Sequence, residues 1–277
     1  MFKKLLIIIM VLVVVVSFSK DSFAADGDDF TPVNLDKKYL KGYYTDTKYI
    51  LASPFRWDKK GWYTFGGVMA IGALIYVYDE ELRDWTQDNI SPDTNHLAEF
   101  GDYFGNGKYM VPGLFGFYAV GAVIDSPKIK RTALLGIESF IITGVLTQVG
   151  KLSFHRHRPR TGDPKDTFDG PSFELDNDNL AMPSGHTSTA FAIATVIATE
   201  YSDSKIIPVL SYSLAAIDAW SRMHYNAHWA SDVFMGAALG YFVSKTIVKL
   251  HDDGPTTLTF MPQLIDDGAY ISVGYRF

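Results

Sequence analysis

Residues 181–199, AMPSGHTSTAFAIATVIAT, join a turn that contains proline and glycine to a long apolar run. The run from Thr187 to Thr199 is typical of a helix, and the turn at residues 183–186 leads directly into it. The backbone N–H groups of Ser184 and Gly185 are therefore predicted to lie at a helix N-terminus, where they can face an anion. Gly185 also lets the chain approach a ligand closely, because it has no side chain.

Fixed cations stand on both sides of this stretch. Lys151 and Arg158 precede it, and Arg222 follows it. A guanidinium group offers paired donors that match two oxygens of a phosphate. The three side chains therefore predict a site for a dianionic phosphate group.

Two histidines supply the chemistry that such a site needs. His228 and Asp232 are four residues apart, which places both on one face if they share a helix. The carboxylate is then expected to accept a proton from one ring nitrogen and to direct the other nitrogen at the substrate, so that His228 is a nucleophile. His186 is left to protonate the leaving oxygen and later to take a proton from water.

Three motifs together carry a family resemblance: Lys-x6-Arg-Pro at 151–159, Pro-Ser-Gly-His at 183–186, and Ser-Arg-x5-His-x3-Asp at 221–232. Their order and spacing resemble the type 2 phosphatidic acid phosphatase (PAP2) and vanadium haloperoxidase superfamily. The resemblance implies an all-α fold, a six-helix PAP2/haloperoxidase-like bundle, at about residues 57–250. It also implies a phosphatase that needs no metal or other cofactor and acts through a phosphohistidine.

The resemblance assigns a role to each site residue. His228 attacks phosphorus, Asp232 stabilises the resulting imidazolium, and His186 protonates the departing alkoxide. The phosphate-binding residues are expected to be Lys151, Arg158, Ser184, Gly185 and Arg222, which stabilise the charge of the transition state. The expected partner is a phosphorylated lipid, or a small soluble phosphoester, as substrate.

Other interpretations of the same residues remain open. Each segment alone is also typical of structure, either a turn into a helix or a solvated basic loop, although eleven positions in the right order argue against coincidence. A vanadium-dependent haloperoxidase would hold vanadate on His228, but such enzymes are usually much longer than this chain. A non-enzymatic envelope protein would only bind anions in the pocket.

The N-terminus has the pattern of a secretory signal peptide. Lys3 and Lys4 precede an apolar run over residues 5–16, and Ser22-Phe23-Ala24 is a small-x-small cleavage site. Residues 1–24 are therefore predicted to be a signal peptide, since a membrane span needs about 20 apolar residues. Residues 25–56 show no clear periodicity and are expected to form an extended arm.

Apolar segments predict six helices, over residues 62–78, 109–124, 132–150, 187–199, 206–217 and 233–244. Several are shorter than the roughly 20 residues of a membrane span, and the mean hydropathy of +0.04 is low for a six-span protein. The basic residues at 128–131 and the acidic residues within 79–102 instead fit an integral topology. The balance favours an exported periplasmic or cell-envelope protein, with the extent of membrane contact left open. Gly236 and Gly240 form a G-x-x-x-G pattern that permits close helix approach.

Composition limits the partners further. With a net charge of −6 in 277 residues, the chain lacks the basic character of a nucleic-acid-binding protein. The acidic segment 161–180 is expected to be a solvated loop beside the pocket. His155, His157 and His224 do not predict a zinc site, because arginines alternate with the first two and no carboxylate or cysteine triad completes a ligand set. They are expected to line the pocket or lie on the surface.

The C-terminal extension, residues 251–277, has a different pattern. Residues 256–264 and 269–277 are typical of strands, and Asp266-Asp267-Gly268 between them is a turn signal. The sequence therefore predicts a short β-hairpin after the helical domain.

Overall fold

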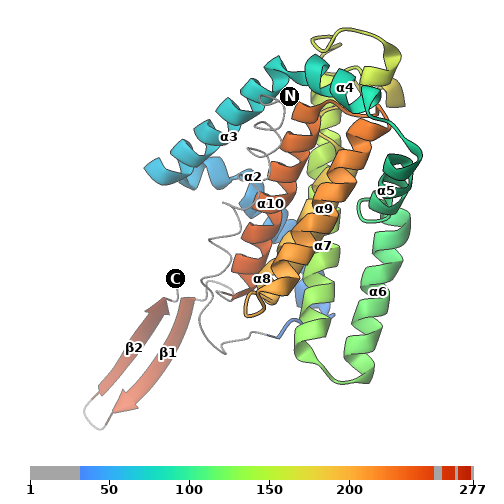
Figure 1. Cartoon of the computed structure of the whole chain (residues 1–277). Helices are drawn as coiled ribbons and strands as arrows, with labels where there is room; N and C mark the ends of the chain where they lie inside the picture. The colour runs from blue at the N-terminus through green and yellow to red at the C-terminus, as the bar shows by residue number, and fades with distance from the viewer. Residues whose placement is uncertain (1–31, 253–257, 266–267, 276–277) are drawn as a thin grey trace.

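The computed structural model describes residues 32–252 and the backbone of residues 258–265 and 268–275. The predicted signal peptide lies outside the described residues. The described part of the chain is mostly helical (Figure 1) and contains nine α-helices rather than the six predicted. They are α2 (Lys37–Leu51), α3 (Lys59–Val77), α4 (Asp79–Asp88), α5 (Pro92–Asp102), α6 (Gly107–Val123), α7 (Pro127–Phe154), α8 (Gly185–Glu200), α9 (Ile206–His224) and α10 (Ala230–Asp252). Three short 3₁₀ turns are η1 (Ser53–Arg56), η2 (Pro159–Thr161) and η3 (Asn177–Asn179).

Each of the six predicted apolar segments lies in a helix, but three further helices form where the sequence predicted none. The most informative is α2, because the prediction of an extended arm over residues 25–56 is wrong for that part. Asp36 caps the helix by accepting a hydrogen bond from the backbone N–H of Tyr39 at 2.8 Å. The Tyr39 hydroxyl then donates to the carbonyl of Leu134 in α7, also at 2.8 Å. This tertiary contact helps to hold α2 against α7.

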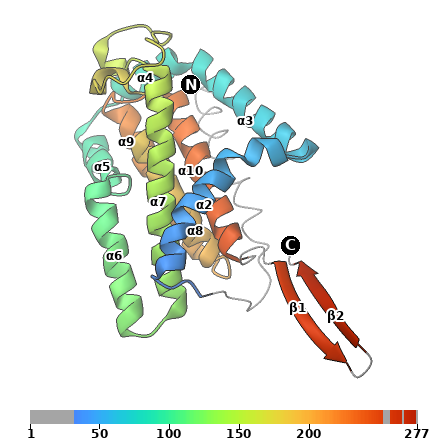
Figure 2. The same ribbon diagram turned by 180° about the vertical axis from the view of Figure 1, so that it is seen from behind.

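The centre of the bundle is α8, which packs against α7, α9 and α10. Every residue from Thr187 to Val196 is buried, so the helix has no solvent-facing side over that length. In the two ribbon views α6, α7, α8, α9 and α10 run side by side, whereas α3 leaves the bundle at an angle (Figures 1 and 2). The loop after α7, together with α4, lies at one end of the bundle.

The contact between α8 and α10 is close because α10 presents glycines to it. A methyl group at Gly236 would lie 2.6 Å from the carbonyl oxygen of Ser184, and one at Gly240 would lie 2.2 Å from that of Ser188. Both distances are too short for any side chain, so the two backbones touch. The predicted close helix approach at the G-x-x-x-G pattern is confirmed.

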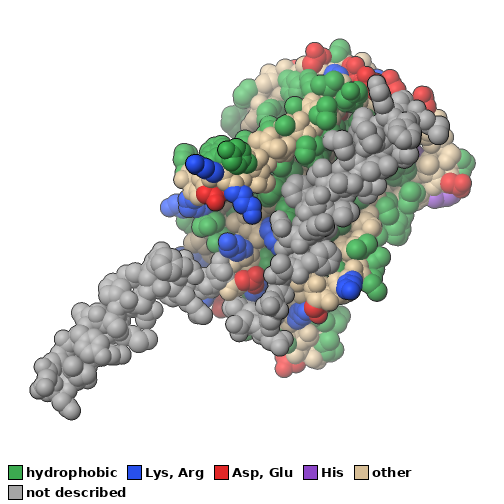
Figure 3. All heavy atoms as spheres, turned by 60° about the vertical axis from the view of Figure 1, so that its left-hand side comes forward, with side chains coloured by type: hydrophobic (Ala, Val, Ile, Leu, Met, Phe, Trp, Pro, Cys, Tyr) green, Lys and Arg blue, Asp and Glu red, His purple; other side chains and the backbone are tan. Residues whose placement is uncertain are grey.

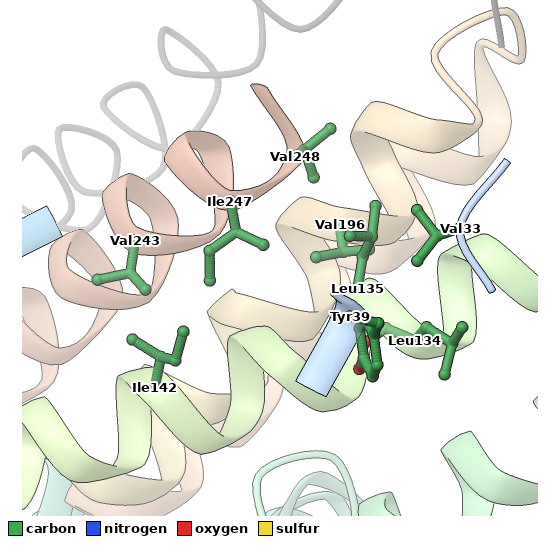
Figure 4. Packing of buried hydrophobic residues seen from close by; sticks show 9 residues of the cluster. All are labelled: Val33, Tyr39, Leu134, Leu135, Ile142, Val196, Val243, Ile247 and Val248. Atoms are coloured by element: carbon green, nitrogen blue, oxygen red, sulfur yellow. The ribbon is translucent and has the colours of Figure 1, made fainter. Parts of the chain in front are cut away.

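A hydrophobic core lies where α2, α7, α8 and α10 meet (Figure 4). Tyr39 of α2 packs there with residues of α7 and α10, such as Leu135 and Ile247, which are fully buried. Burial of each such side chain contributes about 1.5 to 3 kcal/mol. This core ties the N-terminal helix to the last one.

Two helices of the described residues, α7 with 28 residues and α10 with 23, are long and apolar enough to cross a membrane. The pair α3 and α4, bent by 58°, passes the same test as one unit. The segments predicted here were shorter, because both helices continue past the uncharged residues. Hydrophobic side chains also cover much of the surface seen in Figure 3.

The described residues after α10 include two strands, β1 (Leu258–Ile265) and β2 (Gly268–Tyr275). They pair antiparallel, with Leu258 opposite Tyr275 and Ile265 opposite Gly268. In both ribbon views they lie outside the helical bundle (Figures 1 and 2).

Candidate phosphate site

The three predicted motif segments meet at one end of the bundle. They are the end of α7 with its following loop, the N-terminus of α8, and the turn between α9 and α10. The Arg158 guanidinium lies 3.4 Å from Nε2 of His228, measured from Nη1. The Ser184 amide donates to the carbonyl oxygen of Asp232 at 3.0 Å, and a Cβ at Gly185 would lie 3.7 Å from Cε of Lys151. Residues separated by up to 81 positions thus share one location.

Local features of the sequence bring these segments to that end. α7 ends after Phe154 because His155 adopts the left-handed conformation, with φ of 42°. α8 begins at Gly185, and the peptide bond between Met182 and Pro183 is cis. α9 ends at His224, and Asn226, with φ of 51°, turns the chain toward α10.

Two of the predicted cations, Lys151 and Arg158, are buried and bonded to neutral oxygens. The Lys151 ammonium donates to the carbonyl oxygen of Leu180. Arg158 donates to the carbonyl oxygens of Asn177 at 2.6 Å and Ala227 at 3.1 Å. No carboxylate among the described residues lies within 4.0 Å of either charged group, so neither has a direct ion-pair partner, although Asp232 acts on both from farther away. Burial, followed by the neighbouring Arg160, lowers the pKa of Arg158 to about 10.

His228 lies in the turn that precedes α10, two residues before the helix begins at Ala230. The prediction that His228 and Asp232 share a helix is therefore wrong. Nδ1 of His228 lies 3.8 Å from Oδ2 of Asp232, which is longer than a hydrogen bond. Burial, with Arg158 as the next cause, holds the pKa of His228 well below its usual range, so the imidazole is neutral and keeps its lone pair.

Asp232 has a structural role that explains the longer distance. One carboxylate oxygen, Oδ2, accepts the backbone N–H of Trp229 at 2.9 Å and caps α10 from its first turn. The other, Oδ1, accepts a hydrogen bond from Nη1 of Arg156 at 2.6 Å. Both oxygens of the carboxylate are therefore already bonded.

Arg156 was not among the predicted site residues, yet it is fully buried beneath the site. Its Nη2 donates to Asp79 at 2.8 Å and its Nη1 donates to Ser231 at 2.8 Å. Asp79 in turn accepts from the Ser231 backbone N–H at 2.9 Å. The guanidinium thus bridges the first residue of α4 and the first turn of α10 and orients Asp232 from behind.

His186 has a partner that the sequence interpretation also missed. Its Nε2 lies 3.6 Å from Oδ1 of Asp102, the last residue of α5, and the same oxygen accepts a hydrogen bond from Arg222 at 2.6 Å. Burial and the nearby Arg222 lower the pKa of His186 to about 4, while Asp102 opposes that shift. Although burial favours a higher pKa for Asp102, the hydrogen bond from Asn106 and the charge of Arg222 lower that pKa.

Ser184 is placed differently from the prediction. Its amide is bonded to Asp232 and is not free for a ligand, and its hydroxyl lies 3.0 Å from the hydroxyl of Thr187. Gly185 opens α8, where first-turn amides have no partner within the helix. The amide contribution predicted for this turn therefore falls to Gly185 and the residues after it.

The acidic loop contacts the candidate site through Asn177, whose carbonyl oxygen accepts from Arg158. His157 binds Asp163 at 2.7 Å and Asp169 at 3.0 Å, and Arg160 binds Asp178 at 2.6 Å. The hydrogen bonds from both aspartates raise the pKa of His157, Asp163 contributing most.

The other two histidines of the motif segments are separate from one another. His155 bonds the carbonyl oxygens of Leu152 and Glu174, and His224 bonds the side chain of Asn95 at 2.8 Å. The three histidines thus have separate partners and do not converge on one point.

Fold and site define a helical protein with buried cationic side chains beside a neutral histidine. Residues 132–254 match the model of the PAP2 superfamily.

Two curated proteins are similar to parts of the chain. The lipid A 1-phosphatase of Porphyromonas gingivalis is 40% identical over 105 residues, which are 38% of this chain and 20% of that protein. The undecaprenyl-diphosphatase of Sulfolobus acidocaldarius is 31% identical over 132 residues, 46% of this chain and 60% of that protein. The chain thus spans a fifth and three fifths of the length of these relatives.

Two solved structures are also similar. One is the crystal structure of Aquifex aeolicus LpxE, with a TM-score of 0.48 and 21% identity, covering 62% of this chain and 94% of that chain. The other is that of the first transmembrane PAP2 type phosphatidylglycerolphosphate phosphatase from Bacillus subtilis, with a TM-score of 0.49 and 15% identity, covering 66% and 94%.

Proposed function

We propose that this chain is a phosphoric ester hydrolase of the PAP2 type, which hydrolyses phosphomonoesters through a phosphohistidine and favours a lipid phosphate or diphosphate. The observation that carries the proposal is the pair of buried cations, Lys151 and Arg158, bonded to neutral oxygens beside a neutral His228. Buried charges without a counterion are costly, and a phosphate anion would compensate both. The same anion would lie against a nucleophile.

The first step follows from the position of His228. Its Nε2 lies on the side of Arg158, and its Nδ1 lies on the side of Asp232. Nε2 attacks phosphorus as the bond to the alkoxide oxygen breaks, and the imidazole becomes positive. Asp232, whose Oδ2 lies 3.8 Å from Nδ1, stabilises that positive charge electrostatically.

Protonation of the leaving group is the role of His186. Its pKa of about 4 leaves the ring neutral at neutral pH. A bound phosphate group adds negative charge and raises the pKa of His186. Substrate binding therefore favours the protonated ring, which is the form that can act as an acid. His186 gives the proton to the alkoxide. It then takes one from the water that attacks phosphorus and breaks the P–N bond.

The remaining residues hold the phosphate oxygens. Lys151 and Arg158 supply unpaired positive charge, whereas Arg222 already shares Asp102 and contributes less. First-turn amides of α8, beginning with that of Gly185, add donors at the positive end of a helix. Fixed donors of this kind stabilise the charge on the transferring group, and this stabilisation usually contributes most of the rate acceleration in such reactions.

A lipid substrate is favoured by the surface of the bundle. Large apolar side chains are exposed on α3, α6, α7 and α9, including Tyr63, Val123, Val149 and Ile206. Such faces suit contact with lipid rather than water. The lipid A and undecaprenyl substrates in the names of the two curated relatives agree with this. We therefore infer a membrane-associated envelope protein, exported by the signal peptide predicted at residues 1–24.

Phosphate release from a panel of lipid and soluble phosphoesters, with a chelator present, tests the proposal. We expect His228→Ala to lower kcat by at least about 10³-fold. His96→Ala is the matched control, because that side chain is exposed on α5, and it should leave kcat unchanged. Turnover by His228→Ala within tenfold of wild type, with an unchanged thermal transition, would refute the nucleophile assignment. Vanadate should inhibit; bromide oxidation on addition of vanadate and peroxide would instead identify a haloperoxidase.

A further inference from the structure

A second group of charged side chains lies at the other end of α10 from the phosphate site. Asp46 of α2, Glu138 of α7 and His251 of α10 each direct one ligand atom to a common point, and these atoms all lie within 4.8 Å of one another. His251 is 19 residues beyond Asp232, which is about 28 Å along a helix. The group is therefore separate from the phosphate site.

Its geometry leaves three electron-rich groups facing one another. Nδ1 of His251 donates to the backbone carbonyl of Ile247 at 3.0 Å, so Nε2 is the ring nitrogen left to face the carboxylates. That Nε2 lies 3.5 Å from Oε2 of Glu138, and the ring also lies 3.9 Å from Asp46 through Nδ1. Two carboxylates and an imidazole nitrogen at these distances repel one another unless a metal ion or a proton lies between them.

Glu138 gives the clearest indication that the group binds a cation. Its side chain is 0% exposed, and neither carboxylate oxygen has a hydrogen-bond partner among the described residues. No Lys or Arg of the described chain forms an ion pair with Glu138 or Asp46. The nearby Arg131 is bonded to Glu200 at 3.0 Å and to Asp252. A buried carboxylate without donors is costly, and a metal ion would compensate it.

The surroundings also leave room for an ion. Gly42 lies one turn before Asp46 in α2, and a Cβ at this position would be 3.8 Å from Asp46 Oδ2 and 3.9 Å from Glu138 Oε1. The absence of a side chain keeps this face of α2 open toward both carboxylates. Asp46 and His251 are 14% and 16% exposed, which gives an ion a path from solvent.

We propose that Asp46, Glu138 and His251 bind a divalent transition-metal ion, of which Zn²⁺ is the best match, and that the ion holds α2 against α7 and α10. One imidazole and two carboxylates are a ligand set that Zn²⁺ accepts, with water in the remaining position. The bond from Nδ1 to Ile247 fixes the orientation of the ring, as the second ring nitrogen of a metal-binding histidine usually does. The role is structural, because the ion would lie far from the reacting phosphate.

Metal binding to the tag-free full chain in detergent tests the proposal directly. After equilibrium dialysis against Zn²⁺, we expect about one bound ion per wild-type chain. We expect the thermal midpoint to rise by about 5 to 10 °C at a Zn²⁺ concentration about 100-fold above Kd. Glu138→Gln should lose the bound ion and the thermal response. Glu99→Gln, at an exposed position on α5, is the matched control and should keep both.

Three outcomes would overturn the proposal. The first is that the wild-type protein binds no Zn²⁺ and that neither Zn²⁺ nor chelator changes its thermal midpoint. The second is that the Glu138→Gln variant binds as much Zn²⁺ as the Glu99→Gln control does. The third is a wild-type midpoint that responds to pH but not to metal, since a shared proton would then occupy the site. If Glu138→Gln does not fold, the wild-type dialysis and His251→Asn decide the question in the same way.

Discussion

Replacement of Arg156 gives the strongest test of how the site is held together. Its guanidinium bonds Asp79 at 2.8 Å and Asp232 at 2.6 Å, and all three side chains are 0% exposed. Removal of one partner from a buried ion pair costs about 3 to 5 kcal/mol, because it leaves an uncompensated buried charge. Arg156→Met leaves two such charges, so we expect a loss of at least about 3 to 5 kcal/mol. For a chain of this size that lowers the thermal midpoint by about 10 °C or more.

The measurement is thermal unfolding in detergent with two matched variants. Arg160→Met removes a guanidinium from the same segment, but its ion pair with Asp178 is exposed, so we expect a change of at most about 1 kcal/mol. Asp79→Asn combined with Arg156→Met removes one of the two stranded charges. The double variant should therefore be more stable than the sum of the single changes predicts, by about 0.5 to 3 kcal/mol.

In the proposed mechanism Arg156 acts only through Asp232, and we therefore expect it to be a positioning residue. We expect Arg156→Met to lower kcat with little change in KM, because the contacts to the substrate phosphate are elsewhere. Equal midpoints for Arg156→Met and Arg160→Met would refute the reasoning, since the two arginines differ mainly in the burial of their partners.

Two further predictions concern the contact between α8 and α10 and the proton on His186. Gly240→Ala puts a methyl group 2.2 Å from a backbone oxygen of α8, so we expect the free energy of unfolding to fall by about 1 to 3 kcal/mol. Gly144→Ala is the control, because a Cβ at Gly144 would have no other atom within 4 Å. If calorimetry finds both glycine variants equally stable, the close contact is not a constraint. Asp102→Asn removes the charge that raises the pKa of His186, so that pKa falls below about 4. A smaller fraction of His186 is then protonated at a given pH, so the alkaline limb of the plot of kcat against pH should move to lower pH. If this limb does not move, Asp102 is not the partner of the general acid.

The sequence was sufficient for the helices whose apolar runs are long. The buried positions of α8 from Thr187 to Val196 belong to a long run of small and apolar residues after a Pro-Ser-Gly turn, which predicted a helix from the sequence alone. α2 has no such run, because Lys, Asp and Thr alternate with its tyrosines. It folds through the cap at Asp36 and the contact of Tyr39 with α7, and the second of these is a tertiary contact that no local pattern shows.

The residues of the candidate site also fall into a group that the sequence predicted and a group that it did not. The residues that the motifs name, such as Lys151 and His228, are brought together, but the residues that orient them were missed. Asp79 and Asp102 stand among many acids in residues 79–102, and nothing in their spacing distinguishes them from solvated charges. Arg156 alternates with histidines in a basic segment, and only its burial shows that it faces inward. Pairing across 76 or more positions depends on topology, and local spacing does not encode it.

Contacts between helix backbones help to set the position of the proposed catalytic groups. Ser184 immediately precedes α8, and its amide bonds the carbonyl oxygen of Asp232 in α10. The lack of a side chain at Gly236 permits that approach, since a Cβ there would lie 2.6 Å from the Ser184 carbonyl. On the other side, a Cβ at Gly150 of α7 would lie 2.7 Å from Pro183. The turn that leads to His186 therefore lies between two helices, and at each point of contact only glycine fits.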